Sequence, residues 1–206
     1  MTSRAARQGG FTVVEVLLTT VIGLAAVTGF MSMATFQITA SRDQANQLDL
    51  QQTVRDVAEL VAREVRRVGA DPTCAGSFES MEYASFWGIR LKSDLDGSGA
   101  IDSPDENVLY VYTGDRFLRS TTAGSDTLID NVNWDGSRLR YFDGAGVEID
   151  TGFQPLSAAQ RAAVRRVRLV LDVRHVTDAG ETVSAKAATD INLRNRFFVQ
   201  NTGCPS

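Results

Sequence analysis

The chain has 206 residues, of which 43% are hydrophobic and 22% charged, and its formal net charge is −4. This length suits one anchored domain of ordinary size. The modest charge, with both signs well represented, gives no reason to expect nucleic acid or an anionic membrane surface as an obligatory partner.

The first predicted element is a long apolar helix. Residues 11–40 carry no charge except that of Glu15, and a helix of this length spans about 30 Å of hydrocarbon. Arg4 and Arg7 precede the segment, and the first basic residue after it is Arg42. The positive-inside rule therefore keeps the N-terminal end cytoplasmic and predicts that the rest of the chain is exported.

The junction at residues 9–15 is more specific. Gly9 and Gly10 precede the apolar run, whereas the small residues of an ordinary signal peptide follow its apolar core. The order "GG" then "FTVVE" after a short basic leader resembles the class III signal of type IV pilins. That resemblance implies that residues 1–10 are a leader, and that a prepilin peptidase cuts after Gly10 and methylates the new amine of Phe11.

Glu15 is the one acidic residue in this apolar segment. A carboxylate at membrane depth costs about 2.5 to 3.5 kcal/mol on insertion scales, so a partner is expected to neutralise it. The resemblance implies that this partner is the free terminal amine of a neighbouring subunit, which makes Glu15 an assembly residue. The alternative is a tolerated charge that reaches the cytoplasmic interface.

The helix is expected to continue through residues 41–70 as an amphipathic segment and to reach about 85 Å in all. One apolar stripe recurs at spacings of three and four residues, formed by Leu50, Val54, Val57, Val61, Val65 and Val68. Gly69 and the pair Asp71-Pro72 are expected to end it. A single stripe followed at once by strand-like sequence favours packing against a sheet over a coiled-coil stalk.

Residues 71–206 are predicted to form an exported, β-rich head. Short apolar runs separated by turn signals indicate strands at residues 107–114, 127–132, 138–143 and 163–176, a closing strand at 188–201, and one or two helical turns at 156–163. The predicted fold class is α+β, with the long N-terminal helix packed on an antiparallel sheet.

One acidic segment, "DLDGSGAIDSPDE", has the spacing of a calcium loop. Positions 1, 3, 5, 7, 9 and 12 are Asp94, Asp96, Ser98, the carbonyl of Ala100, Asp102 and Asp105, and Gly99 occupies the turn. Asp at position 12 reaches less far than Glu, so Glu106 is a possible substitute. The segment predicts calcium, and the alternative is an acidic turn without metal.

Two cysteines, Cys74 and Cys204, lie on the predicted exported side, where disulfides persist. We predict that they pair. Closing so long a loop contributes about 4 to 5 kcal/mol in the chain-entropy model. The alternative is a pair of unpaired thiols.

Residues that would support catalysis are scarce, so we expect no enzyme. His175 is the single histidine, and it alternates with Val173 as a strand-face residue does. A basic region consists of Arg161, Arg165, Arg166, Arg168 and Arg174. A solvated strand face explains it better than DNA binding, so nucleic acid is not the first choice of partner.

A second resemblance narrows the function. The segments "LVAREVRRVGADPTC", "VRRVRLVLDVRH" and "INLRNR" resemble the PilW type of minor pilin, while J-type pseudopilins of type II secretion share the helix and signal. The resemblance implies a minor pilin that primes assembly and lies at the pilus tip. Its implied partners are other minor pilins, the major pilin, prepilin peptidase, the inner-membrane assembly platform and a tip adhesin. A third hypothesis is a membrane-anchored module for calcium-dependent adhesion or DNA binding.

Overall fold

The computed structural model describes residues 11–73, 78–177, 180 and 182–193. It divides the chain into two compact units, residues 1–45 and 46–206. Cys74 and Cys204, predicted to form a disulfide, both lie outside the described residues, as does Gly10 of the predicted cleavage site.

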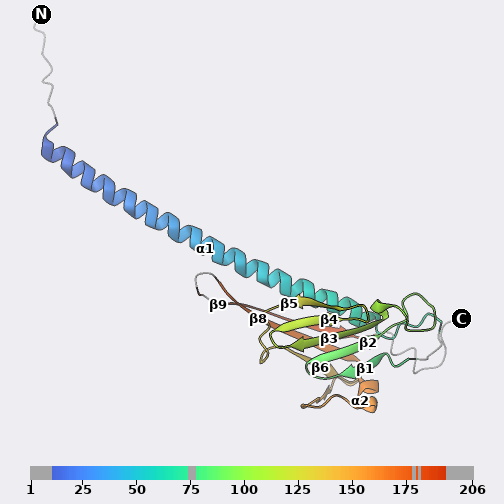
Figure 1. The fold of residues 1–206 in the computed structure, drawn as a ribbon. Helices are drawn as coiled ribbons and strands as arrows, with labels where there is room; N and C mark the ends of the chain where they lie inside the picture. Colours follow the sequence, from blue (N-terminus) through green and yellow to red (C-terminus); the bar gives the residue numbers. More distant parts are fainter. Residues whose placement is uncertain (1–10, 74–77, 178–179, 181, 194–206) are drawn as a thin grey trace, which may run out of the picture. The chain divides into compact units, whose positions relative to one another are not determined.

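Helix α1 (Val13–Arg67) runs without interruption for 55 residues (Figure 1). In the first unit its apolar side chains face outward, and its most hydrophobic window has a mean hydropathy of 2.0 with none of its residues buried. By length and composition this part of α1 fits a membrane span. The predicted helix at residues 11–40 is therefore present, and the predicted continuation through residues 41–70 ends at Arg67.

The C-terminal part of α1 belongs to the second unit, the head. The predicted stripe is buried there: Val54, Val61, Val65 and Val68 are each at most 1% exposed, and Leu50 packs against the core at its margin. Burying a valine side chain fully stabilises a fold by about 1.5 to 3 kcal/mol. Gly69, with φ of 74°, follows the helix in the left-handed conformation expected of a C-terminal glycine.

The head contains two antiparallel sheets in its described part, where the sequence predicted one. The five-stranded sheet has the order β1-β2-β3-β4-β5 and the four-stranded sheet has the order β7-β6-β8-β9. The strands are β1 (Met81–Ala84), β2 (Gly88–Lys92), β3 (Asn107–Thr113), β4 (Arg116–Ser120), β5 (Ser125–Ile129), β6 (Arg138–Phe142), β7 (Glu148–Ile149), β8 (Arg166–Val176) and β9 (Thr182–Asn192).

One hydrophobic core joins both sheets and the helix stripe. Buried tyrosines connect the two sheets through hydrogen bonds: Tyr112 donates to the carbonyl of Val170 at 2.9 Å, and Tyr141 donates to that of Ser85 at 2.8 Å. Each hydroxyl satisfies a polar group inside the core, where an unpaired group would be costly. The expected α+β class, with a long N-terminal helix packed on antiparallel sheets, is confirmed.

A short helix, α2 (Ala158–Ala163), precedes β8 where one or two helical turns were predicted. The Ser157 hydroxyl accepts the N–H of Gln160, and the Gln160 side chain accepts the N–H of Ser157, which is a complete capping box. This cap explains why so short a helix begins at this point.

Candidate functional sites at the helix start and the acidic loop

The start of α1 places Glu15 in its first turn. The Thr12 side-chain oxygen accepts the backbone N–H of Glu15 at 3.3 Å, and the Thr12 carbonyl accepts the same N–H at 3.0 Å. The spacing from Thr12 to Glu15 is that of a capping box, and a carboxylate in a first turn interacts favourably with the helix dipole. The helix begins at Val13, after Phe11 and Thr12, and Phe11 is 83% exposed.

The acidic loop lies between β2 and β3. Asp94 is fully buried, and its carboxylate accepts the backbone N–H groups of Gly97 at 2.7 Å and Gly99 at 2.9 Å. Both glycines have positive φ, 77° and 80°, a conformation that side chains disfavour. Asp96 accepts the N–H of Ser98 at 2.8 Å. The first half of the loop is therefore folded around aspartate oxygens.

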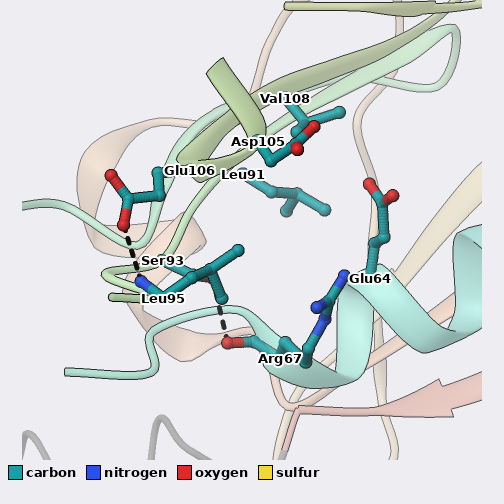
Figure 2. Close-up of a pocket in the computed structure, with 8 residues that line it drawn as sticks. All are labelled: Glu64, Arg67, Leu91, Ser93, Leu95, Asp105, Glu106 and Val108. Atoms are coloured by element: carbon teal, nitrogen blue, oxygen red, sulfur yellow. Dashed lines mark hydrogen bonds between the residues drawn. The ribbon is translucent and has the colours of Figure 1, made fainter. Parts of the chain in front are cut away.

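Glu106 closes the loop from its other end. Its carboxylate accepts four backbone N–H groups, those of Leu95 at 2.8 Å, Asp96 at 3.3 Å, Asp102 at 3.1 Å and Ser103 at 2.9 Å. Figure 2 shows the bond from Leu95. The bonds from Ser103 and Leu95 are the main reason that the pKa of Glu106 lies below its ordinary value. Hydrogen bonds from neutral backbone N–H groups thus favour the ionised form of this buried carboxylate.

The predicted calcium ligands are only partly brought together. Ligand oxygens of Asp94, Asp96 and Glu106 lie within 4.8 Å of one another. Partial desolvation of the carboxyl, and the nearby charges of Asp96 and Glu106, raise the pKa of the exposed Asp102. The Ser98 hydroxyl contacts the carbonyl of Ala100 at 3.5 Å. The arrangement offers hard oxygen ligands, which suit calcium.

Asp105, predicted at position 12, contacts another group. Its carboxylate accepts a hydrogen bond from Arg119 at 2.8 Å, and Arg119 lies 3.3 Å from Glu64 of α1. The Tyr110 hydroxyl donates to Glu64 as well. Asp105 therefore belongs to an ion-pair chain that joins the loop to β4 and to the end of α1, and Glu106 is the carboxylate that lies with Asp94 and Asp96.

Sequence reasoning missed the main role of Glu106. Ser103 and Glu106 have the capping-box spacing around η1 (Pro104–Glu106): the Glu106 carboxylate accepts the Ser103 N–H at 2.9 Å, and the Glu106 N–H donates to the Ser103 carbonyl at 3.1 Å. That spacing, with Pro104 at the first helical position, is a local sequence signal for the start of a helix. The network of Glu64, Tyr110 and Arg119 had no such local signal, because its members lie on three separate elements.

The predicted basic region is divided between α2, which carries Arg161, and the outer face of β8, where Arg166, Arg168 and Arg174 occupy alternate positions. Arg161 bonds Glu79 at 2.8 Å and the carbonyl of Met81 at 3.0 Å, and Arg165 donates to the carbonyl of Ala162 at 2.7 Å. Arg168 pairs with Asp190 at 2.7 Å, and Arg166 lies over the Phe142 ring. These arginines mostly hold neighbouring elements of the head. His175 is exposed on β8, as predicted for a strand-face residue.

Comparison with known proteins yields one structural likeness to report. No family model and no curated protein matches the chain. A solved type IV-like pilin from Thermus thermophilus is similar to 74% of this chain over 96% of its own length, with 12% identity and a TM-score of 0.47.

The lowered pKa of Glu106 predicts how head stability depends on pH. Because the folded state holds this pKa below the ordinary 4.5, its contribution is complete above pH 4.5 and is lost as pH falls through the folded value. Glu106→Gln should therefore lower the unfolding free energy at pH 7 and flatten its fall in acid. Denaturant unfolding of the full chain between pH 7 and 3 measures this.

Asp126→Asn, on an exposed position of β5, is the matched control and should leave the pH dependence unchanged. An acid-induced loss of stability that is equally steep in wild type and in Glu106→Gln would contradict the assignment.

Proposed function

We propose that this chain is a minor pilin of a type IV pilus, which helps to prime assembly and lies at or near the pilus tip. The observation that carries the proposal is the position of Glu15, in the first turn of an exposed apolar helix that begins at Val13, shortly after the "GG" junction. Removal of residues 1–10 would leave Phe11 as the new terminus, close in sequence to this carboxylate.

The physical case rests on the environment of α1. A long, apolar and exposed helix needs a covering medium, which is lipid in the free subunit and the helices of other subunits in a filament. Glu15 then selects the register, because an ion pair with a neighbour's terminal amine forms only when both charges reach the same depth. The buried part of α1 is covered by the core of the head, so this part of the helix does not need lipid or another subunit to cover it.

The minor class and the tip position rest on resemblance and on the size of the head. A repeated shaft subunit must fit its head between identical neighbours, whereas a terminal subunit is free of that demand. The partners proposed on this basis are other minor pilins, the major pilin, prepilin peptidase, the assembly platform and a tip adhesin. A type II secretion pseudopilin is the nearest alternative and would use Gly10, Phe11 and Glu15 in the same way.

Glu15→Gln separates assembly from helix capping. Glutamine serves in a capping box as glutamate does, but it carries no charge. We expect the variant to reach the inner membrane at wild-type levels and to be recruited at least tenfold less into filaments, measured by immunoblotting of sheared pili. Glu59→Gln, an exposed glutamate farther along α1, is the matched control. Normal recruitment of Glu15→Gln would sink the ion-pair mechanism.

A calcium-dependent head is a second proposal, favoured by the convergence of Asp94, Asp96 and Glu106. These residues would hold the ion, whose effect would be to stiffen the loop. All three carboxylates already accept backbone N–H groups, so the loop has a metal-free explanation as well. Calcium-dependent adhesion by a membrane-anchored module would follow from this site, and DNA binding would not.

Millimolar calcium should raise the melting temperature of the head, because binding to the folded state adds RT ln(1 + [Ca²⁺]/Kd), about 2.7 kcal/mol at one hundred times Kd. Asp96→Asn keeps the size of the exposed side chain and should remove the calcium-dependent increase, whereas Asp135→Asn should not. Scanning calorimetry with calcium or with a chelator measures the difference. If the wild-type chain melts identically with calcium and with a chelator, the calcium site is rejected and the loop is a metal-free acidic turn.

A further inference from the structure

β9 is an edge strand of the four-stranded sheet and differs from the other sheet edges in the described head. All eleven of its residues pair in unbroken register with β8, from Arg166 opposite Asn192 to Val176 opposite Thr182. Nothing in the described part of the chain pairs with its other side. A long, regular edge of this kind is a template for another strand.

The other edges in the described head have protective features. β7 has two residues. β1 has four residues and an irregular register between Met81 and Tyr83, and β5 has five residues beside a register shift at Phe117 and Leu118. Short length and bulges are the devices that block edge pairing. β9 has neither.

The register shows which backbone groups of β9 are open. The Leu193 N–H donates to the carbonyl of Arg165 at 2.9 Å, so the odd-numbered residues beside it face β8. In an antiparallel ladder, alternate residues turn their N–H and C=O groups away from the partner strand. The groups at the open edge are therefore those of Ser184, Lys186, Ala188, Asp190 and Asn192.

The side chains of β9 do little to guard this edge. Its two charged residues reach back toward β8: Asp190 pairs with Arg168 through two bonds of 2.8 and 2.7 Å, and Lys186 lies 4.0 Å from Asp172. The strand contains no proline, and most of its other side chains are small. An approaching strand therefore meets no proline or large side chain, and the more exposed of the two charges is that of Lys186, whose side chain is 59% exposed.

The core is also incomplete at this edge. Val183, Ala187 and Thr189 lie on the inner side of β9, in register with Ala185 and Ile191, which are at most 4% exposed. Yet these three side chains stay partly exposed, and Ala187 packs at the margin of the core. A further strand with apolar residues at alternate positions would cover them.

We propose that the open edge of β9 accepts an extended strand from a different subunit of the assembly. Taking the partner from a pilus rests on the proposed function, whereas the ability to accept a strand rests on the edge alone. Antiparallel pairing of two β9 edges about a two-fold axis would reverse one head relative to the other. Subunits anchored in the same membrane keep one direction, which favours a different partner strand.

The first test uses the purified full-length chain in detergent micelles, with residue-resolved amide hydrogen exchange. Alone, the even-numbered amides 184–192 should exchange at least tenfold faster than the odd-numbered amides 185–191. The probe is a synthetic peptide with the sequence of residues 182–192. In an antiparallel pairing its aspartate can lie opposite Lys186 and its lysine opposite Asp190. This peptide should slow the even-numbered amides at least tenfold, and a scrambled peptide should not.

Ala188→Pro removes one open-edge N–H without touching the β8 ladder, so it should keep the melting temperature and lose the peptide response. Ala187→Pro, its neighbour, removes a ladder N–H and should melt lower. Ser184→Pro repeats the test nearer the start of β9. Three results would overturn strand acceptance. The first is slow exchange of the even-numbered amides in the isolated chain, and the second is an exchange rate that the peptide does not change. The third is full slowing by the peptide in both Ala188→Pro and Ser184→Pro.

The second test takes the chain in sheared filaments, where the even-numbered amides should be as slow as the odd-numbered ones. Fast exchange there would overturn the subunit partner. Failure of Glu15→Gln to affect recruitment, by contrast, would count against the pilus function and leave the peptide result standing. The two proposals therefore fail separately.

Discussion

The structure depends on one helix that has to suit two surroundings. The first part of α1 exposes apolar side chains in every direction, whereas its last turns bury one valine stripe and expose charge. A soluble head cannot cover the first part, and a lipid phase cannot replace the packing of the last. The chain is therefore divided at about residue 45, although the helix itself is continuous.

The end of α1 is held by polar contacts as much as by the stripe. The Ser93 hydroxyl donates to the carbonyl of Arg67 at 2.9 Å (Figure 2). The Glu64 carboxylate accepts hydrogen bonds from the Tyr110 hydroxyl and from Arg119. The same arginine reaches Asp105 beside the acidic loop. These ion pairs connect the acidic loop on the surface of the head to the C-terminal end of α1.

The sequence predicted α1 well because its signals are local. The spacing of apolar residues by three and four, with charged residues between them, predicted the stripe from Val54 to Val68, and Gly69 predicted the end of the helix. The two-sheet head was harder to foresee, because pairs such as Tyr112 with Val170 join residues far apart in the chain. β4 was missed since its five residues include two arginines, and β9 begins six residues before the predicted start because small side chains give a weak strand signal. In the acidic loop, the same run of residues matches a calcium-ligand spacing and, from Ser103 to Glu106, a capping-box spacing. A glutamate such as Glu106 suits either role, so the local pattern does not distinguish them.

The most direct test of the account is the intact mass of the chain purified from membranes of cells with an active prepilin peptidase. The account predicts a protein that begins at Phe11 and carries one added methyl group, since only a freed amine can pair with Glu15 of a neighbour. A chain that still carries residues 1–10 after incorporation into filaments would contradict it.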